Sequence, residues 1–256
     1  MSRLSELYAQ NAAVKWLAFY YEQKPEVQVA LLETEVRIRS KSKLGRGRAD
    51  GLIVALLSDG SVYTASLEAK SSKTFFNINP FYKYEKWLLH AILIGMVGLI
   101  LAEITGQWVG GWFLIWVLPV LIFILVGFAY LAITVEHSHY RAIDVIAQVR
   151  NYPANEQWIA ISTDAYNQLG TERETLHKDC HKEGIGLIRV SAGEQITLLS
   201  TARPKNSLKG HQDFLICYAR RESIYKKLQE TWKKKQEKVV SHLNFAQNND
   251  NLLSGE

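Results

Sequence analysis

Two long runs of apolar residues dominate the pattern of hydrophobic and polar positions along this chain. The first runs from Trp87 to Thr105 and has His90 and Glu103 as its only ionisable residues, one near each end. The second, from Trp112 to Val135, has none. At about 1.5 Å per residue, each run is long enough to cross a hydrocarbon layer roughly 30 Å thick. The pattern predicts a transmembrane hairpin; the alternative is a pair of buried core helices.

The residues that flank the two runs predict the orientation of this hairpin. The short connection GQWVGG contains no Lys or Arg, whereas Lys83, Lys86 and Arg141 flank the outer ends. Because positive residues favour the cytoplasmic side of a membrane, we expect two spans in the inner (cytoplasmic) membrane, with both termini in the cytoplasm. Neither span has a charge in its interior, so the hairpin is interpreted as an anchor in the lipid bilayer or a contact within a homo-oligomer, and not as a transport pathway.

Outside the hairpin, the apolar positions recur with helical and strand periods. The expected elements, in chain order, are a helix over 3–23, strands over 27–40, 49–57 and 61–70, a helix over 139–152, a strand over 157–163, a helix over 171–182, strands over 184–190 and 195–200, and a charged helix over 222–243. This order predicts an α/β domain that the hairpin interrupts. We therefore divide the chain into a first half of the core (1–80), the hairpin (81–140, with spans at about 87–105 and 112–135), a second half of the core (141–203), and a basic C-terminal helix and tail (204–256).

Positive charge is concentrated in two places, although the net charge of the 256 residues is only +5. Six Lys or Arg residues and no acid lie in one segment, namely Arg37, Arg39, Lys41, Lys43, Arg46 and Arg48. A basic segment of this kind binds nucleic-acid phosphates without reading sequence. The second concentration, in the tail helix, has three interpretations: phosphate binding, attraction to anionic lipid headgroups, or a solvated helix face. The two cysteines form no CxxC pair, which predicts neither a disulfide framework nor a zinc site and agrees with a reducing cytosol.

Candidate chemistry appears where the 61–70 strand ends, because Glu68 and Lys70 share one face of it. Asp50 starts the preceding strand. A three-residue loop, Ser58–Gly60, with Gly60 in the left-handed region, would place Asp50 opposite Glu68 on that same face. A two-residue Asp-Gly turn would instead place Asp50 opposite Ala69, on the other face.

Two carboxylates beside a lysine offer a site for a hard cation. Asp50 and Glu68 would provide oxygen ligands to Mg²⁺, with Mn²⁺ as the alternative ion. Lys70 would hold or deprotonate an attacking water, or stabilise a phosphorane-like transition state. The alternative is that Glu68 and Lys70 are an edge-strand charge pair that keeps the strand soluble.

These residues also carry a resemblance to a known family. The succession of GRAD (Gly47–Asp50), a hairpin, and EAK (Glu68–Lys70) resembles the motif of the PD-(D/E)xK nuclease superfamily, with Ala49 in place of the proline. QVRNY (Gln148–Tyr152) resembles the Q-x3-Y motif of the RecB-type branch, which lies on the helix after the lysine strand.

The resemblance implies a restriction-endonuclease-like core, αβββ-αβ plus a further αβ, into which the hairpin is inserted. It implies a Mg²⁺-dependent nuclease, with DNA favoured over RNA, in which Asp50, Glu68, Lys70, Gln148 and Tyr152 form the site. The family often has a further acidic residue on its first helix, and Glu6 and Glu22 are the candidates here. The alternative is a non-catalytic, membrane-tethered protein that keeps this fold to bind nucleic acid or to act as a scaffold or sensor.

Overall fold

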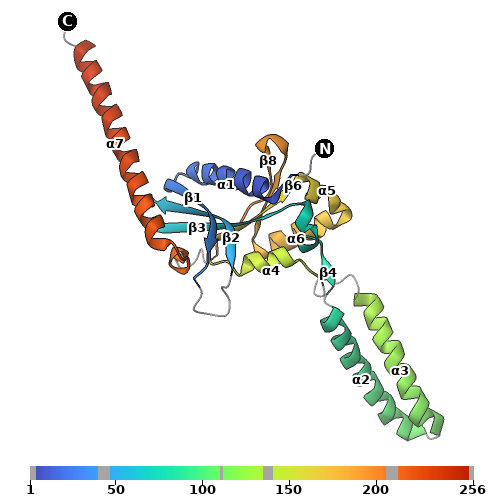
Figure 1. Cartoon of the computed structure of the whole chain (residues 1–256). Helices are drawn as coiled ribbons and strands as arrows, with labels where there is room; N and C mark the ends of the chain where they lie inside the picture. Colours follow the sequence, from blue (N-terminus) through green and yellow to red (C-terminus); the bar gives the residue numbers. More distant parts are fainter. Residues whose placement is uncertain are drawn as a thin grey trace. The chain divides into compact units, whose positions relative to one another are not determined.

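The computed structural model describes residues 4–39, 47–82, 84–109, 112–134, 141–205 and 213–253. The chain forms two compact units, coloured along the sequence in Figure 1. One unit comprises Met1–Asn79 together with Asp144–Glu256, and the other is Pro80–Ile143. The first unit is therefore built from two segments, one on each side of the second unit in the sequence.

The first unit contains a mixed six-stranded sheet with the strand order β1-β2-β3-β6-β7-β8. Its strands are β1 (Val27–Arg37), β2 (Arg48–Leu57), β3 (Val62–Lys70), β6 (Glu156–Ser162), β7 (Gly186–Val190) and β8 (Ile196–Ser200). The first three strands are antiparallel to one another, β3, β6 and β7 are parallel, and β8 is antiparallel to β7. The expected α/β class is confirmed.

Helices cover both faces of this sheet. They are α1 (Glu6–Glu22), α4 (Asp144–Arg150), α5 (Thr163–Gln168), α6 (Arg173–Glu183) and α7 (Arg221–Leu253), with short 3₁₀ turns at Ser72–Asn77, Gly170–Glu172, Ala192–Glu194 and Phe214–Cys217. Ile224 and Leu228, near the start of α7, belong to one hydrophobic cluster with Val29 and Val36 of β1 and Leu52 and Val54 of β2. The opposite face of β2, which carries Ile53, packs against α1.

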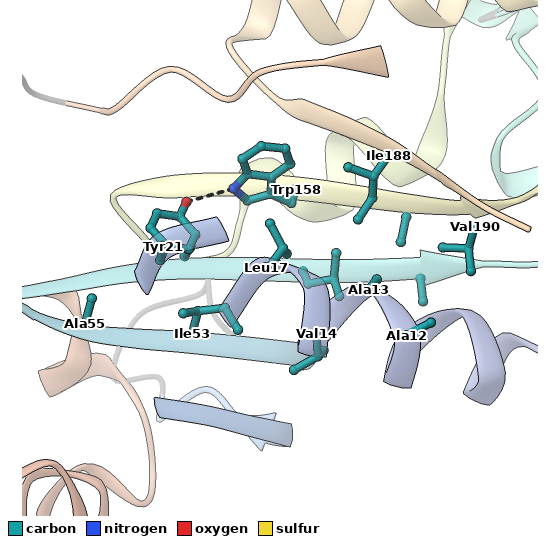
Figure 2. Close-up of a cluster of buried hydrophobic side chains, with 14 of the residues drawn as sticks. Ala12, Ala13, Val14, Leu17, Tyr21, Ile53, Ala55, Trp158, Ile188 and Val190 are labelled. Carbon is teal, nitrogen blue, oxygen red and sulfur yellow. Dashed lines mark hydrogen bonds between the residues drawn. The ribbon is translucent and has the colours of Figure 1, made fainter. Parts of the chain in front are cut away.

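Helix α1 packs against one face of the sheet and forms the core on that side together with apolar residues of the strands (Figure 2). Its N-cap residue is Ser5, whose side chain accepts a hydrogen bond from the Tyr8 N–H at 3.1 Å. Val14 approaches β2 closely at Gly51, where an added Cβ would lie 2.5 Å from Val14 Cγ2. The fully buried Trp158 of β6 packs in the same cluster, and its Nε1–H donates to the Tyr21 hydroxyl at 2.9 Å. The indole therefore adds apolar area to the core and leaves no donor unpaired.

The register between β2 and β3 follows from their connecting loop. Leu57 N–H donates to Ser61 O at 2.9 Å, and Gly60 adopts a φ of +79°. The ladder then pairs Leu56 with Val62 and Gly51 with Leu67, so the next position places Asp50 opposite Glu68. The predicted three-residue loop and its register are confirmed.

Several expectations about single elements were wrong. Strand β3 lies between β2 and β6 and all its residues are buried, so Glu68 and Lys70 are not an edge-strand pair. The helix expected over 139–152 is shorter. It begins at Asp144, because Arg141 and Ala142 form a two-residue strand, and it ends at Arg150, shortly before Pro153, which disfavours helical geometry in the residue before it. The short helix α5 was not predicted, and α7 extends to Leu253, beyond the expected end.

The second unit is a pair of antiparallel helices, α2 (Tyr84–Val109) and α3 (Trp112–Thr134). Its chain ends are joined by the two-residue strands β4 (Phe81–Tyr82) and β5 (Arg141–Ala142), and Trp87 Nε1–H donates to Thr134 Oγ1 at 3.0 Å. The helices approach closely at Gly95, where an added Cβ would lie 2.7 Å from the Phe123 ring. By length and composition, one helix among the described residues is able to cross a membrane, at Tyr84–Leu101; the apolar stretch Pro119–Thr134 of α3 is shorter.

The loop geometry leads to a prediction about Gly60. Nothing lies within 4 Å of a Cβ added there, so a substitution costs only the strain of the positive φ. Gly60→Ala should lower the free energy of unfolding by about 1 kcal/mol. Gly60→Asn should cost less, because asparagine tolerates left-handed geometry. Thermal unfolding followed by circular dichroism measures both; equal losses would contradict the assigned conformation.

Candidate active site

The structure brings Asp50, Glu68 and Lys70 together on one face of the sheet. Lys70 Nζ lies 2.5 Å from Glu68 Oε1, and these two residues are 5% and 2% exposed. Asp50 is half-buried, and its Oδ2 accepts the Ala69 N–H, which lies between the other two residues, at 2.8 Å. The register described above is the reason that Asp50 reaches this point.

Gln148 and Tyr152 both bind Glu68. Gln148 Nε2 donates to Glu68 Oε1 at 2.7 Å, and the Tyr152 hydroxyl donates to Glu68 Oε2 at 2.6 Å. Tyr152 lies in the turn after α4, where its N–H donates to Val149 O at 2.9 Å. The turn continues the helical path closely enough that Gln148 Nε2 and the Tyr152 hydroxyl lie 2.7 Å apart. The pairing expected of the Q-x3-Y residues therefore exists, although Tyr152 lies outside the helix.

The Glu68 carboxylate is the electrostatic centre of this group. A buried charge is tolerated only where an opposite charge and hydrogen-bond donors replace water. Here Lys70 and Gln148 contact Oε1, and Tyr152 contacts Oε2. Burial and the adjacent Glu68 raise the pKa of Tyr152 well above its usual value, so the phenol stays protonated and remains a donor.

The Asp50 carboxyl lies near two other acidic residues and one cation, so its surroundings carry an excess of negative charge. Burial, and then Glu68, raise its pKa from 3.8 to about 6; the hydrogen bond from Ala69 and the Lys70 ammonium act in the opposite direction. Glu6, in the first turn of α1, also raises the pKa of Asp50. Glu6 Oε2 accepts from the Thr74 hydroxyl at 2.8 Å, whereas Glu22 is exposed at the other end of α1. Of the two acidic candidates on the first helix, Glu6 is therefore the one that lies near this site.

The donor set fits a small divalent cation. Within the described ranges, no group of three or more His, Cys, Asp or Glu side chains could by itself hold a metal ion. Mg²⁺ is commonly held by one or two carboxylates and fills its remaining positions with water and phosphate oxygens. Asp50 and Glu68 match that requirement, and a cation between them would offset the charge excess that raises the Asp50 pKa.

Half of the predicted phosphate-binding residues can be placed. Arg37 ends β1 and Arg48 starts β2; they are cross-strand partners and, like Arg39, are exposed. Arg48 Nη1 lies 3.3 Å from Glu35 Oε2. Lys41, Lys43 and Arg46 lie outside the described residues.

Residues that the motifs do not include also contact this site. Gln10 Nε2 donates to the Asp50 backbone carbonyl at 2.6 Å, and Gln157 Nε2 donates to Val149 O and Tyr152 O at 2.5 and 2.8 Å. The only signal in the sequence is a polar residue within an otherwise apolar face or strand. That signal does not reveal the partner, because the partner is a backbone carbonyl in a distant segment.

Comparison with known proteins identifies no relative of this chain. No family model matches the chain, and no curated protein or solved structure matches it.

The raised pKa of Asp50 predicts a pH-dependent gain in stability for Asp50→Asn. Because the native carboxyl holds its proton more tightly than the unfolded one, wild type loses stability as pH rises from about 4 through about 6. Without Mg²⁺ at about pH 8, Asp50→Asn should therefore be more stable by about 2 kcal/mol, and the gain should vanish near pH 4.

Thermal unfolding across this pH range measures the effect. Glu22→Gln is the control, because that carboxylate is exposed and outside the site. A gain that is independent of pH, or equal in the control, would contradict the electrostatic description.

Proposed function

We propose that this chain is a Mg²⁺-dependent nuclease that hydrolyses phosphodiester bonds, with DNA favoured over RNA as its substrate. One observation carries the proposal: residues from three separate segments meet around one buried carboxylate. Lys70, Gln148 and Tyr152 contact Glu68, and Asp50 accepts the N–H of the adjacent Ala69. A restriction-endonuclease-like core is part of this proposal. Its support is the order of α1, the β1–β2–β3 meander, α4 and the parallel strand β6.

Each residue of the site has a distinct role in this proposal. Asp50 and Glu68 would hold Mg²⁺, or Mn²⁺ in its place; the bound ion neutralises charge on the phosphate and lowers the pKa of a coordinated water. Lys70 places a positive charge beside the scissile phosphate, where it orients the attacking water or stabilises developing negative charge. Tyr152 keeps Glu68 oriented. Gln148 is exposed while it contacts Glu68, so it is accessible to substrate as well.

The exposed arginines support an anionic substrate. Arg37 and Arg48 lie directly across from each other on β1 and β2, and like charges in such a pair destabilise a sheet. Glu35 lies beside Arg48, and a phosphate backbone that passes the start of β2 would supply further negative charge to both arginines. Arg48 precedes Asp50 by two residues in the same strand, so this contact would lie next to the site. Contacts of this type position a substrate without selecting a sequence.

We also propose that the hairpin spans the inner membrane twice and anchors the nuclease at its cytoplasmic face. Large apolar side chains on both helices are exposed, which is unfavourable in water and favourable in lipid. Those on α2 include Leu88, Leu89, Leu93, Val97 and Leu101, and those on α3 include Val120, Ile124, Leu125, Phe128 and Ile133. The close approach at Gly95 resembles the small-residue contacts by which helices associate in membranes.

One observation favours the non-catalytic alternative. Both oxygens of Glu68 already receive hydrogen bonds from protein donors, so this carboxylate is satisfied without a metal. In the alternative, the same face binds nucleic acid independently of Mg²⁺, and the buried network is only structural.

A cleavage assay separates the two functions. Purified full-length protein with Mg²⁺ should cleave plasmid or linear DNA, and Lys70→Ala should reduce the rate by at least about a hundredfold. Lys73→Ala is the matched control, because Lys73 is exposed on the turn that follows β3. DNA binding without cleavage, unchanged by chelation of Mg²⁺ and by Asp50→Asn, would establish the binding protein instead.

Fractionation of cells tests the anchor. The full chain should remain in the membrane fraction after alkaline carbonate extraction.

Cysteine labelling tests the orientation. In a background with Cys180→Ala and Cys217→Ala, Ser58→Cys on the exposed β2–β3 loop should react with a membrane-impermeant maleimide only after the inner membrane is opened. Recovery of the chain in the soluble fraction would contradict the spans, and labelling in intact cells would contradict the orientation.

A further inference from the structure

Two buried glutamines contact the backbone of the segments that carry the proposed site. Gln10 is 5% exposed and Gln157 is 2% exposed. Each donates its side-chain amide to backbone carbonyls and has no direct contact with Glu68 or Lys70 among the described hydrogen bonds. Burying a polar amide is unfavourable unless it is hydrogen-bonded, and these contacts satisfy the amide nitrogen of each glutamine. The Oε1 of Gln157 is buried without a hydrogen-bond partner among the described residues.

Gln157 fixes the end of α4 to the sheet. The last carbonyls of a helix have no partner within the helix, and α4 has only seven residues. Gln157 Nε2 donates to Val149 O in the last turn and to Tyr152 O in the loop that follows. Gln157 is the β6 partner of Ser66, two residues before Glu68 on the same face of β3. This amide therefore joins the segment that carries Gln148 and Tyr152 to the sheet at a position close to Glu68.

Gln10 supports Asp50 at an interruption of the sheet. The β1–β2 ladder pairs Thr34 with Gly51 and Val36 with Ala49, and it omits the intervening pair of Glu35 and Asp50. Glu35 has a φ of +55°, which L-residues rarely adopt and which breaks regular strand pairing. The Asp50 carbonyl accepts from Gln10 Nε2 at 2.6 Å. A side chain of α1 thus supplies a donor at the point where the neighbouring strand departs from regular geometry.

We infer that Gln10 and Gln157 are positioning residues: Gln10 orients the Asp50 half of the site, and Gln157 orients the Gln148–Tyr152 half. This inference rests on the proposed nuclease function. Because the two amides hold different segments, their loss has different consequences. Loss of Gln10 weakens the metal site, whereas loss of Gln157 disorders the donors that hold Glu68.

The test uses methionine, which has a similar size and shape but lacks the amide. Gln157→Met should lower kcat of the full-length protein by about tenfold to a hundredfold with little change in KM for DNA. In a Gln148→Ala/Tyr152→Phe background, Gln157→Met should lower kcat further by less than about twofold, because the side chains through which it acts are already absent. Ser66→Ala is the matched control: its hydroxyl is buried without a hydrogen-bond partner among the described residues, and Ser66 is the cross-strand partner of Gln157.

Gln10→Met should instead raise the Mg²⁺ concentration needed for half-maximal activity by about tenfold. Mg²⁺ should also raise the melting temperature of the protein in the absence of DNA. Gln10→Met should increase the Mg²⁺ concentration that gives half of this stabilisation by the same factor. Gln23→Met, the same change at the exposed end of α1, should alter neither value. Gln10→Met and Gln157→Met should have additive effects, because they act on separate segments.

Hydrogen exchange distinguishes failure of the inference from failure of the proposed function, because it does not require activity. Gln157→Met should accelerate amide exchange at residues 148–152 severalfold and leave α1 unchanged. If wild type cleaves DNA while Gln157→Met changes neither exchange nor kcat, the inference is wrong and the nuclease remains. If wild type does not cleave DNA, the proposed function is wrong, and the exchange pattern still shows whether Gln157 holds α4. Gln157→Asn, which has a shorter side chain with the same amide, replaces Gln157→Met if that variant does not fold, and its exchange pattern is read in the same way.

Discussion

A carboxylate removed from water on the central strand β3 is the constraint on which the rest of the site depends. Glu68 is 2% exposed, and its negative charge requires a cation and hydrogen-bond donors in fixed places. Lys70 supplies the charge from the same strand, and Gln148 and Tyr152 supply donors from the segment around α4. These partners explain why α4 must end close to the sheet and why its short length is sufficient. The arrangement is specific, because an apolar residue at position 68 would leave the Lys70 ammonium buried without its partner.

Asp50 shows the opposite electrostatic balance. Its neighbours include two acids, Glu68 and Glu6, and one nearby cation, and burial raises its pKa further. An ionised Asp50 therefore makes the folded protein less stable, which is common where residues are selected for chemistry and not for packing. In the proposed function, the same excess of charge would attract a divalent cation, so stability and metal affinity would oppose each other at this one residue. The Ala69 N–H and the Gln10 amide limit the freedom of Asp50 to move away.

The parts of the fold that depend on local chemistry were predictable from the sequence. The Ser58–Gly60 loop determines the register of β2 and β3, so the meeting of Asp50 and Glu68 followed from adjacent residues alone. The contacts of Gln148 and Tyr152 were predicted only through a motif, because α4 is 80 residues from Glu68 in the chain. The end of α4, the two-residue strands β4 and β5, and the roles of Gln10 and Gln157 were not predictable. Each depends on backbone groups that come close only in the folded protein.

The inserted second unit explains why such non-local contacts matter here. The chain leaves the sheet domain after Asn79 and re-enters it at Asp144, the first residue of α4, so the position of α4 is not determined by a short connection from β3. The entropy of closing a long loop rises slowly with its length, by about 0.6 kcal/mol for each doubling, so an insertion of this size is tolerated. A long connection nevertheless provides no orientation. The orientation of α4 must come from contacts made after the chain returns. Those in the structure include the burial of Val145, Ile146 and Val149, the hydrogen bonds to Glu68 and the Gln157 amide. The residues proposed to carry out the chemistry are therefore also among those that join the two sequence halves of the domain.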